Sequence, residues 1–203
     1  MDVDYLPLIT FIIATAGTPG PNNTMIFSSG ASYGFRRSIP HVAGINIGFP
    51  LMVVAVGLGI GSVLERFPTV YSVLRVIAAC YLVYLAYRIA TAPVTKNPEV
   101  LRGRPLSFIR AALFQWVNPK TWVMAVGVVA AFAHASGSAY VVEVLVIALV
   151  FLIFGTPCTT AWLLAGMSLS RIFSKPLHLR VLNVALALLL VASLVPLFGD
   201  AFS

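Results

Sequence analysis

Charged side chains are scarce in this sequence. Aspartate, glutamate, lysine and arginine together make up only 9% of its 203 residues, whereas hydrophobic residues make up 60%. A soluble domain carries about a quarter charged residues, because its surface has to interact with water. The chain lacks the charge to cover such a surface. Its composition therefore predicts an all-α integral membrane protein in which lipid is the solvent.

Acidic residues are the scarcest of the charged types. The six of them lie between the apolar runs or at their ends: Asp2, Asp4, Glu65, Glu99, Glu143 and Asp200. No carboxylate is therefore placed to balance a cationic substrate in the middle of a membrane. The sequence also has no HExxH motif, no paired acidic residues within an apolar run and no cluster of histidine and cysteine. We therefore predict no enzyme, no metal site and no cofactor.

Apolar runs long enough to cross a bilayer are abundant, since a spanning helix needs ~20 residues. Three runs contain no charge: 42–64, 144–167 and 181–199. Three more are interrupted by charged, polar or helix-breaking residues: 5–27, 69–89 and 110–133. We therefore predict about six transmembrane helices, which form a single multi-pass domain over residues 1–203.

The 13 lysine and arginine residues predict the topology. Most lie in the first, third and fifth links between the runs: Arg36, Arg37; Arg88, Lys96, Arg102, Arg104, Arg110; Arg171, Lys175, Arg180. The positive-inside rule places these links in the cytoplasm and both termini outside. Because short clusters between apolar runs form no continuous basic face, nucleic acid is not a predicted partner. The three histidines lie near the ends of runs, and we expect them at the interface: His41, His134 and His178.

The two halves of the chain share a pattern of prolines. Pro7 and Pro21 have the same spacing as Pro105 and Pro119. With three helices in each half, the second half enters the membrane from the opposite side. This pattern is typical of the inverted-topology repeats of secondary transporters. We predict a first repeat over residues 1–90, a cytoplasmic linker over 91–107 and a second repeat over 108–203.

The first apolar run is broken by Thr18-Pro19-Gly20-Pro21-Asn22-Asn23. Two prolines remove backbone donors and the glycine between them relaxes the chain, so that a helix cannot continue undisturbed. A half-helix that begins here offers free N–H groups to a carboxylate, and the carbonyls of the preceding half can accept from an ammonium. We predict a zwitterion site at Pro19, Gly20, Pro21, Asn22, Asn23 and Thr24. The alternative is a kink that serves packing alone.

A second break is predicted at Asn118, Pro119 and Lys120 in the fourth run. Lys120 could meet the substrate carboxylate from the other half, since an ionisable residue within a span indicates function. Alternatively, the helix starts near Thr121 and Lys120 extends to the lipid headgroups. Asn46, in the second span, either lines the path or bonds to a neighbouring helix.

At these motifs the sequence resembles the LysE/RhtB family of amino-acid exporters. The resemblance covers essentially the whole chain and rests on TPGPN at 18–22, GFRRS at 34–38, AGINIGF at 43–49, NPK at 118–120 and the apolar run 182–191. Within the family these motifs look most like the branch that exports cysteine and O-acetylserine. In one departure, the second span lacks the acidic residue that many members carry after its glycines.

The resemblance implies a secondary transporter that exports small neutral amino acids from the cytoplasm across the bacterial inner membrane. Cysteine and O-acetylserine are the leading substrates, and threonine- or homoserine-type amino acids are the alternative. A passive channel or a structural membrane subunit is a second alternative. Ion gradients drive such exporters, and we take the coupling ion to be a proton. The expected partners are thus the amino acid, the proton and the lipid bilayer, and a homodimer is left open.

Overall fold

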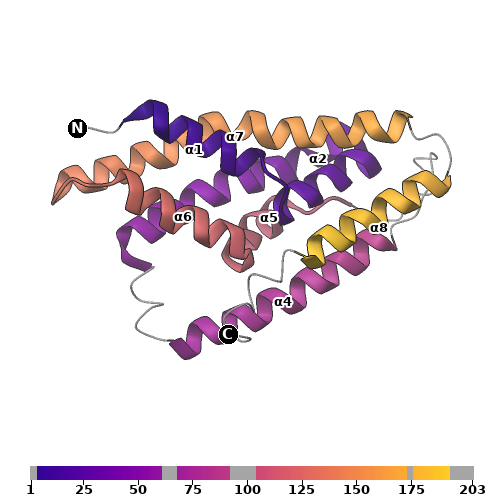
Figure 1. The fold of residues 1–203 in the computed structure, drawn as a ribbon, viewed down its shortest axis with the longest axis horizontal. Coiled ribbons are helices and arrows are strands. Elements are labelled where there is room, and N and C mark those ends of the chain that lie inside the picture. Colours follow the sequence, from indigo (N-terminus) through magenta and orange to yellow (C-terminus); the bar gives the residue numbers. More distant parts are fainter. Residues whose placement is uncertain (1–3, 61–67, 92–103, 173–175, 193–203) are drawn as a thin grey trace.

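The computed structural model describes residues 4–60, 68–91, 104–172 and 176–192, and this part contains helices and no strands. The elements follow one another along the chain (Figure 1): α1 (Tyr5–Gly17), α2 (Pro21–Ala55), the π-helical turn η1 (Val56–Ile60), α4 (Pro68–Ala90), α5 (Phe108–Phe114), the 3-10 turn η2 (Gln115–Val117), α6 (Pro119–Phe132), α7 (Ser138–Ile172) and α8 (Pro176–Ala192). The prediction of an all-α protein is confirmed.

Helix α2 reverses direction at Gly34. This glycine has φ 74° and ψ −177°, a backbone conformation that L residues rarely adopt. Ser29 Oγ and His41 Nδ1 lie 2.9 Å apart, although twelve residues of continuous helix would separate them by about 18 Å. Residues 21–33 therefore complete the crossing that α1 begins, and residues 35–55 return as the second crossing. The predicted spans ended at residue 27 and resumed at residue 42, which left a long link between them. In the structure both helices continue up to the turn, because the turn needs only the single residue Gly34.

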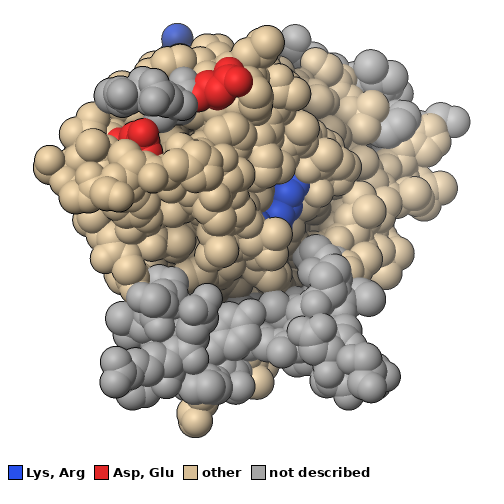
Figure 2. Space-filling view, turned by 60° about the vertical axis from the view of Figure 1, so that its left-hand side comes forward, with Lys and Arg blue, Asp and Glu red and all other residues tan. Residues whose placement is uncertain are grey.

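The predicted six crossings correspond to α1 with residues 21–33, residues 35–60, α4, α5 with α6, α7, and α8. Among the described helices, Pro21–Ile60 and Ser138–Ser170 are long and apolar enough to cross a membrane. The first of these contains the Gly34 turn. Apolar side chains such as Leu6 (76% exposed) and Val123 (75%) lie on the outer surface. Charged atoms are sparse on the face drawn in Figure 2. Such a surface suits lipid rather than water.

Glycines set the spacing between α2 and its neighbours. A Cβ at Gly30 would collide with the Leu163 carbonyl oxygen of α7, and a Cβ at Gly166 would collide with the Phe27 carbonyl oxygen of α2. Small residues allow this close approach of membrane helices, for which lipid provides no hydrophobic driving force. Helices α4 and α8 lie side by side as a second group, as Figure 1 shows.

Candidate functional site

The structure interrupts two helices at the predicted prolines. Helix α1 ends at Gly17 and α2 begins at Pro21, whereas η2 ends at Val117 and α6 begins at Pro119. Both prolines occupy the first turn of the second half-helix, where a missing N–H leaves no helical bond unmade. The two breaks lie against each other, although about one hundred residues separate them in the chain.

Lys120 connects the second break to the first. Its Nζ donates to the Thr18 carbonyl oxygen (2.8 Å), to Thr18 Oγ1 (2.8 Å) and to the Pro19 carbonyl oxygen (3.2 Å). The ammonium group therefore lies on the carbonyl end of α1 rather than out toward the lipid headgroups. It is also engaged by acceptors of the chain itself, so it is not free for a substrate carboxylate in this conformation.

A pair of amide side chains forms a second connection. Asn22 Nδ2 donates to Gln115 Oε1 (2.8 Å), and Gln115 Nε2 donates back to Asn22 Oδ1 (3.2 Å). Gln115 is completely buried and also donates to the Ala111 carbonyl oxygen (2.8 Å). Sequence reasoning missed Gln115. The available signal was an amide three residues before Asn118, inside an otherwise apolar run.

The two breaks also share an internal bond pattern, two residues after each proline. Asn23 Nδ2 donates backwards to the carbonyl oxygens of Ala16 and Thr18, at 2.7 Å each. Thr121 Oγ1 donates to the carbonyl oxygens three and six residues before it, at 2.6 Å each. Asn23 thus satisfies carbonyls at the end of the broken helix α1, whereas Thr121 adds a bond to carbonyls that also accept from backbone N–H groups. This correspondence agrees with the predicted repeat, whose division at residues 90 and 108 stays a prediction; the linker segment 92–103 lies outside the described residues.

A cavity of about 50 Å³, lined by both polar and apolar residues, lies where the breaks meet. Of the predicted site residues, six line it: Gly20, Asn22, Asn23, Asn46, Asn118 and Lys120. Four do not: Pro19, Pro21, Thr24 and Pro119. The prolines end and start the half-helices, while Thr24 is buried one turn into α2. The cavity also contains residues that sequence reasoning did not select, including Thr15 and Thr159.

Two amide donors of this cavity have no partner. Asn46 Oδ1 accepts from Thr159 Oγ1 (3.0 Å), and Asn118 Oδ1 accepts from the Lys120 backbone N–H (3.1 Å). These bonds fix both amides through their oxygens, and both Nδ2 atoms stay buried and unpaired. An unpaired buried donor costs about 1–3 kcal/mol. Among the described residues these two donors stay unsatisfied, and a group with hydrogen-bond acceptors, such as a carboxylate, would satisfy them if a small shift of the side chains brought them into contact.

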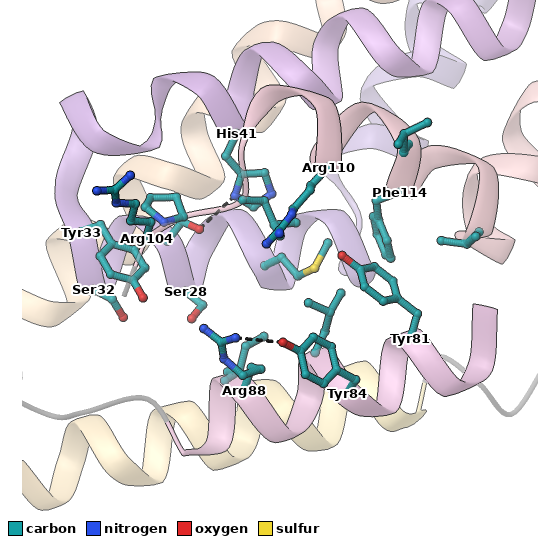
Figure 3. Close-up of a pocket in the computed structure, with 18 residues that line it drawn as sticks. Ser28, Ser32, Tyr33, His41, Tyr81, Tyr84, Arg88, Arg104, Arg110 and Phe114 are labelled. Carbon is teal, nitrogen blue, oxygen red and sulfur yellow. Dashed lines mark hydrogen bonds between the residues drawn. The ribbon is translucent and has the colours of Figure 1, made fainter. Parts of the chain in front are cut away.

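A larger cavity, of about 620 Å³, lies between α2, α4 and α5. Figure 3 shows Arg88, Arg104 and Arg110 around it, with Arg88 Nη1 donating to Tyr84 Oη (2.9 Å). Its charged lining is basic within the described part of the chain. The two cavities are neighbours along α2. Asn22 lines the smaller cavity, and Met25, about one helical turn further along, lines the larger one.

His41 lies in the wall of this larger cavity. It is completely buried and hydrogen-bonded to Ser29, so the prediction of an interfacial position is wrong for this histidine. The cause is the reversal at Gly34, which folds residues 35–55 back onto residues 21–33. His134 and His178 are exposed, as expected for residues near helix ends.

On the opposite side of the breaks, toward the N-terminus of α1, the interior is apolar. A cluster that includes Leu8, Ile12, Met52, Val128 and Phe151 packs between α1, α2, α6 and α7. The space between the breaks thus has a basic cavity on one side and a tightly packed apolar layer on the other.

Two apolar helices that are broken at prolines, with their ends around one cavity, are typical of transporters of the broken-helix type. The LysE type translocator family matches residues 13–197, and the chain belongs to this family. Proteins named "Cysteine/O-acetylserine efflux protein" from Escherichia coli (strain K12), Escherichia coli O9:H4 (strain HS) and Shigella flexneri serotype 5b (strain 8401) are each 36% identical to it over 192 residues. The match covers 93% of this chain and 94% of each relative. No solved structure matches the chain. The family predicted from the motifs is thus confirmed.

Proposed function

We propose that this protein is a secondary exporter of small neutral amino acids across the bacterial inner membrane, with cysteine and O-acetylserine as the leading substrates. The observation that carries the proposal is the cavity between the two breaks, where two buried amide donors have no partner among the described residues. The names of the relatives support the substrate and the outward direction. Threonine- or homoserine-type amino acids are the alternative substrates.

The cavity suits a zwitterion. Asn46 and Asn118 carry two donors that suit a carboxylate. The Thr18 and Pro19 carbonyl oxygens do not line the cavity, but they adjoin it through Lys120 and are acceptors for an ammonium. Among the residues that line the cavity there is no acidic side chain that could balance a second positive charge. A substrate with a neutral side chain is therefore favoured. The small volume favours a short side chain against Phe49 and Phe151.

The larger cavity supports uptake from the cytoplasmic side. It lies beside the Gly34 turn and the start of α5, the ends that the positive-inside rule assigns to the cytoplasm. Its arginines attract the carboxylate of an amino acid. Export then requires that the contacts on this side tighten while the apolar layer on the other side opens, as in alternating access between two repeats. A proton as the coupling ion and a homodimer belong to the same proposal.

The test is efflux of labelled cysteine from preloaded membrane vesicles. Asn46→Ala and Asn118→Ser each remove an unpaired donor, and serine keeps an oxygen that can cap α6. We expect each variant to lower kcat/KM for export about tenfold, since a lost bond to a charged group is worth about 1.5–3 kcal/mol. Asn183→Ala, at a buried asparagine in α8 away from the cavity, is the matched control. Export at the full rate by the double variant would contradict the site, and absence of amino-acid export by the unaltered protein would contradict the function.

A further inference from the structure

The carbonyl end of α1 already holds an ammonium group, and this group belongs to the chain itself. Lys120 Nζ has three acceptors within 3.2 Å, namely two carbonyl oxygens and the hydroxyl of Thr18. An ammonium has three N–H donors, so each donor has one acceptor. The Thr18 and Pro19 acceptors, called here the carbonyl cradle, therefore match a primary ammonium group.

Within the described ranges, no carboxylate takes part in holding this charge on the cradle. The acidic residues in the described part of the chain are Asp4 and Glu143. Glu143 accepts from the backbone N–H groups of His134 and Ala135, at 2.9 Å each, in the link between α6 and α7. Asp4 precedes α1, at the far end from the cradle. The lysine is thus stabilised by carbonyl dipoles and by the negative end of the α1 macrodipole.

We infer that Lys120 is a tethered stand-in for the ammonium group of the substrate, and that an amino acid displaces it on binding. The inference rests on the proposed function, because it assigns the ammonium end of the same site. The Thr18 carbonyl oxygen already accepts from Asn23 Nδ2 and from Lys120 Nζ, which uses both of its lone pairs. A substrate ammonium can therefore bind to this oxygen only by replacing the lysine.

Displacement links binding to movement. Lys120 belongs to the second break and Thr18 to the first, so their bonds join the two halves of the chain. A substrate that replaces Lys120 in the cradle breaks these bonds. The Asn22–Gln115 pair of amides still connects the two breaks. Binding then favours conformations in which the breaks have moved apart, because a ligand shifts an equilibrium by its differential affinity for the two states.

The opposite reading is that Lys120 leaves the cradle to pair with the substrate carboxylate. Amine labelling of the unaltered, purified protein decides between the two. Lys96 and Lys175 are the other lysines of the chain and serve as internal references. If the lysine is displaced, saturating L-cysteine should raise the labelling rate of Lys120 several-fold relative to both references, as measured by mass spectrometry. A lower rate would show pairing with the carboxylate, and an unchanged rate would show that the lysine stays in place; both results overturn the inference.

The affinity of a Lys120 variant for L-cysteine is an independent measurement, because the two interpretations predict changes in opposite directions. Lys120→Met keeps an unbranched side chain and removes the competing charge, so it should tighten L-cysteine binding about tenfold; Lys175→Met is the control. Weaker or equal binding by a folded Lys120→Met protein overturns the inference. If this variant does not fold, the labelling of the unaltered protein still decides. Failure of the unaltered protein to bind any amino acid contradicts the proposed function, whereas normal binding without release of Lys120 contradicts the displacement alone.

Discussion

The two helix breaks occupy related positions in the chain but differ in chemistry. At the first break, Thr18, Pro19 and Gly20 lie between the helices, and Gly20 caps α2 with no side-chain bond. At the second break a single residue, Asn118, lies between η2 and α6, and its side chain caps α6. The first break presents carbonyl oxygens, whereas the second provides the Lys120 ammonium and a free amide donor. The first break therefore presents mainly acceptors, whereas the second presents mainly donors.

Loss of the Asn22–Gln115 bonds, which connect the two breaks, is expected to lower the stability of the protein the most. Gln115→Leu leaves the Asn22 amide without its partner and removes the bond to the Ala111 carbonyl oxygen. We expect a loss of about 2–3 kcal/mol in the free energy of unfolding in detergent, because buried polar groups become unpaired. In the double variant Asn22→Leu/Gln115→Leu both partners are apolar, and part of the loss should be recovered. A double variant that loses the full sum of the two single effects would show that the amide pair is not coupled.

A smaller difference in stability is expected between variants at Asn23 and Thr121, which occupy equivalent positions two residues after the prolines. Asn23→Leu removes both donors to the carbonyls that end α1, whereas Thr121→Val removes a hydroxyl whose acceptor at Asn118 also accepts from two backbone N–H groups. We expect a loss of about 2 kcal/mol for Asn23→Leu and about 1 kcal/mol for Thr121→Val. Thermal unfolding of both variants in the same detergent measures the difference. Equal losses would show that the breaks are not asymmetric in this respect.

The smallest effect on stability is expected at Gly20, where φ is 175° and any residue fits the backbone. A Cβ there would lie 2.7 Å from Lys120 Cδ, which belongs to a flexible side chain that can move. Gly20→Ala should change the free energy of unfolding by less than about 0.5 kcal/mol and still raise the amine reactivity of Lys120. Gly17→Ala, with nothing within 4 Å of the new Cβ, is the control. Equal reactivity in the two variants would show that Gly20 does not hold the lysine in place.

Much of this arrangement follows from local sequence. Proline and glycine act on their own backbone, so the breaks at 18–21 and 118–119 could be predicted from the residues alone. The helical class could also be predicted, because the apolar runs have the length of membrane-spanning helices. A link between the first two spans was predicted, but its reduction to the single residue Gly34 was not, because an isolated glycine is also tolerated within a helix.

The contacts between the breaks could not be predicted. The Asn22–Gln115 and Thr18–Lys120 bonds join residues 93 and 102 positions apart, and no local pattern specifies their partners. The target of Lys120 was therefore expected to be a carboxylate or a headgroup, whereas the structure places it on carbonyls. The larger cavity was missed because it depends on how α4 packs beside α2 and α5.

The glycine contacts between α2 and α7 limit how such a protein can move. Gly30 faces the main chain at Leu163, and Gly166 faces the main chain at Phe27, so the two backbones approach each other closely at both points. Interdigitated main chains cannot slide past each other without a steric clash, whereas side chains can change rotamers to accommodate a shift. We therefore expect residues 21–33 and α7 to move together as one unit, with any rocking during a transport cycle taking place around this pair.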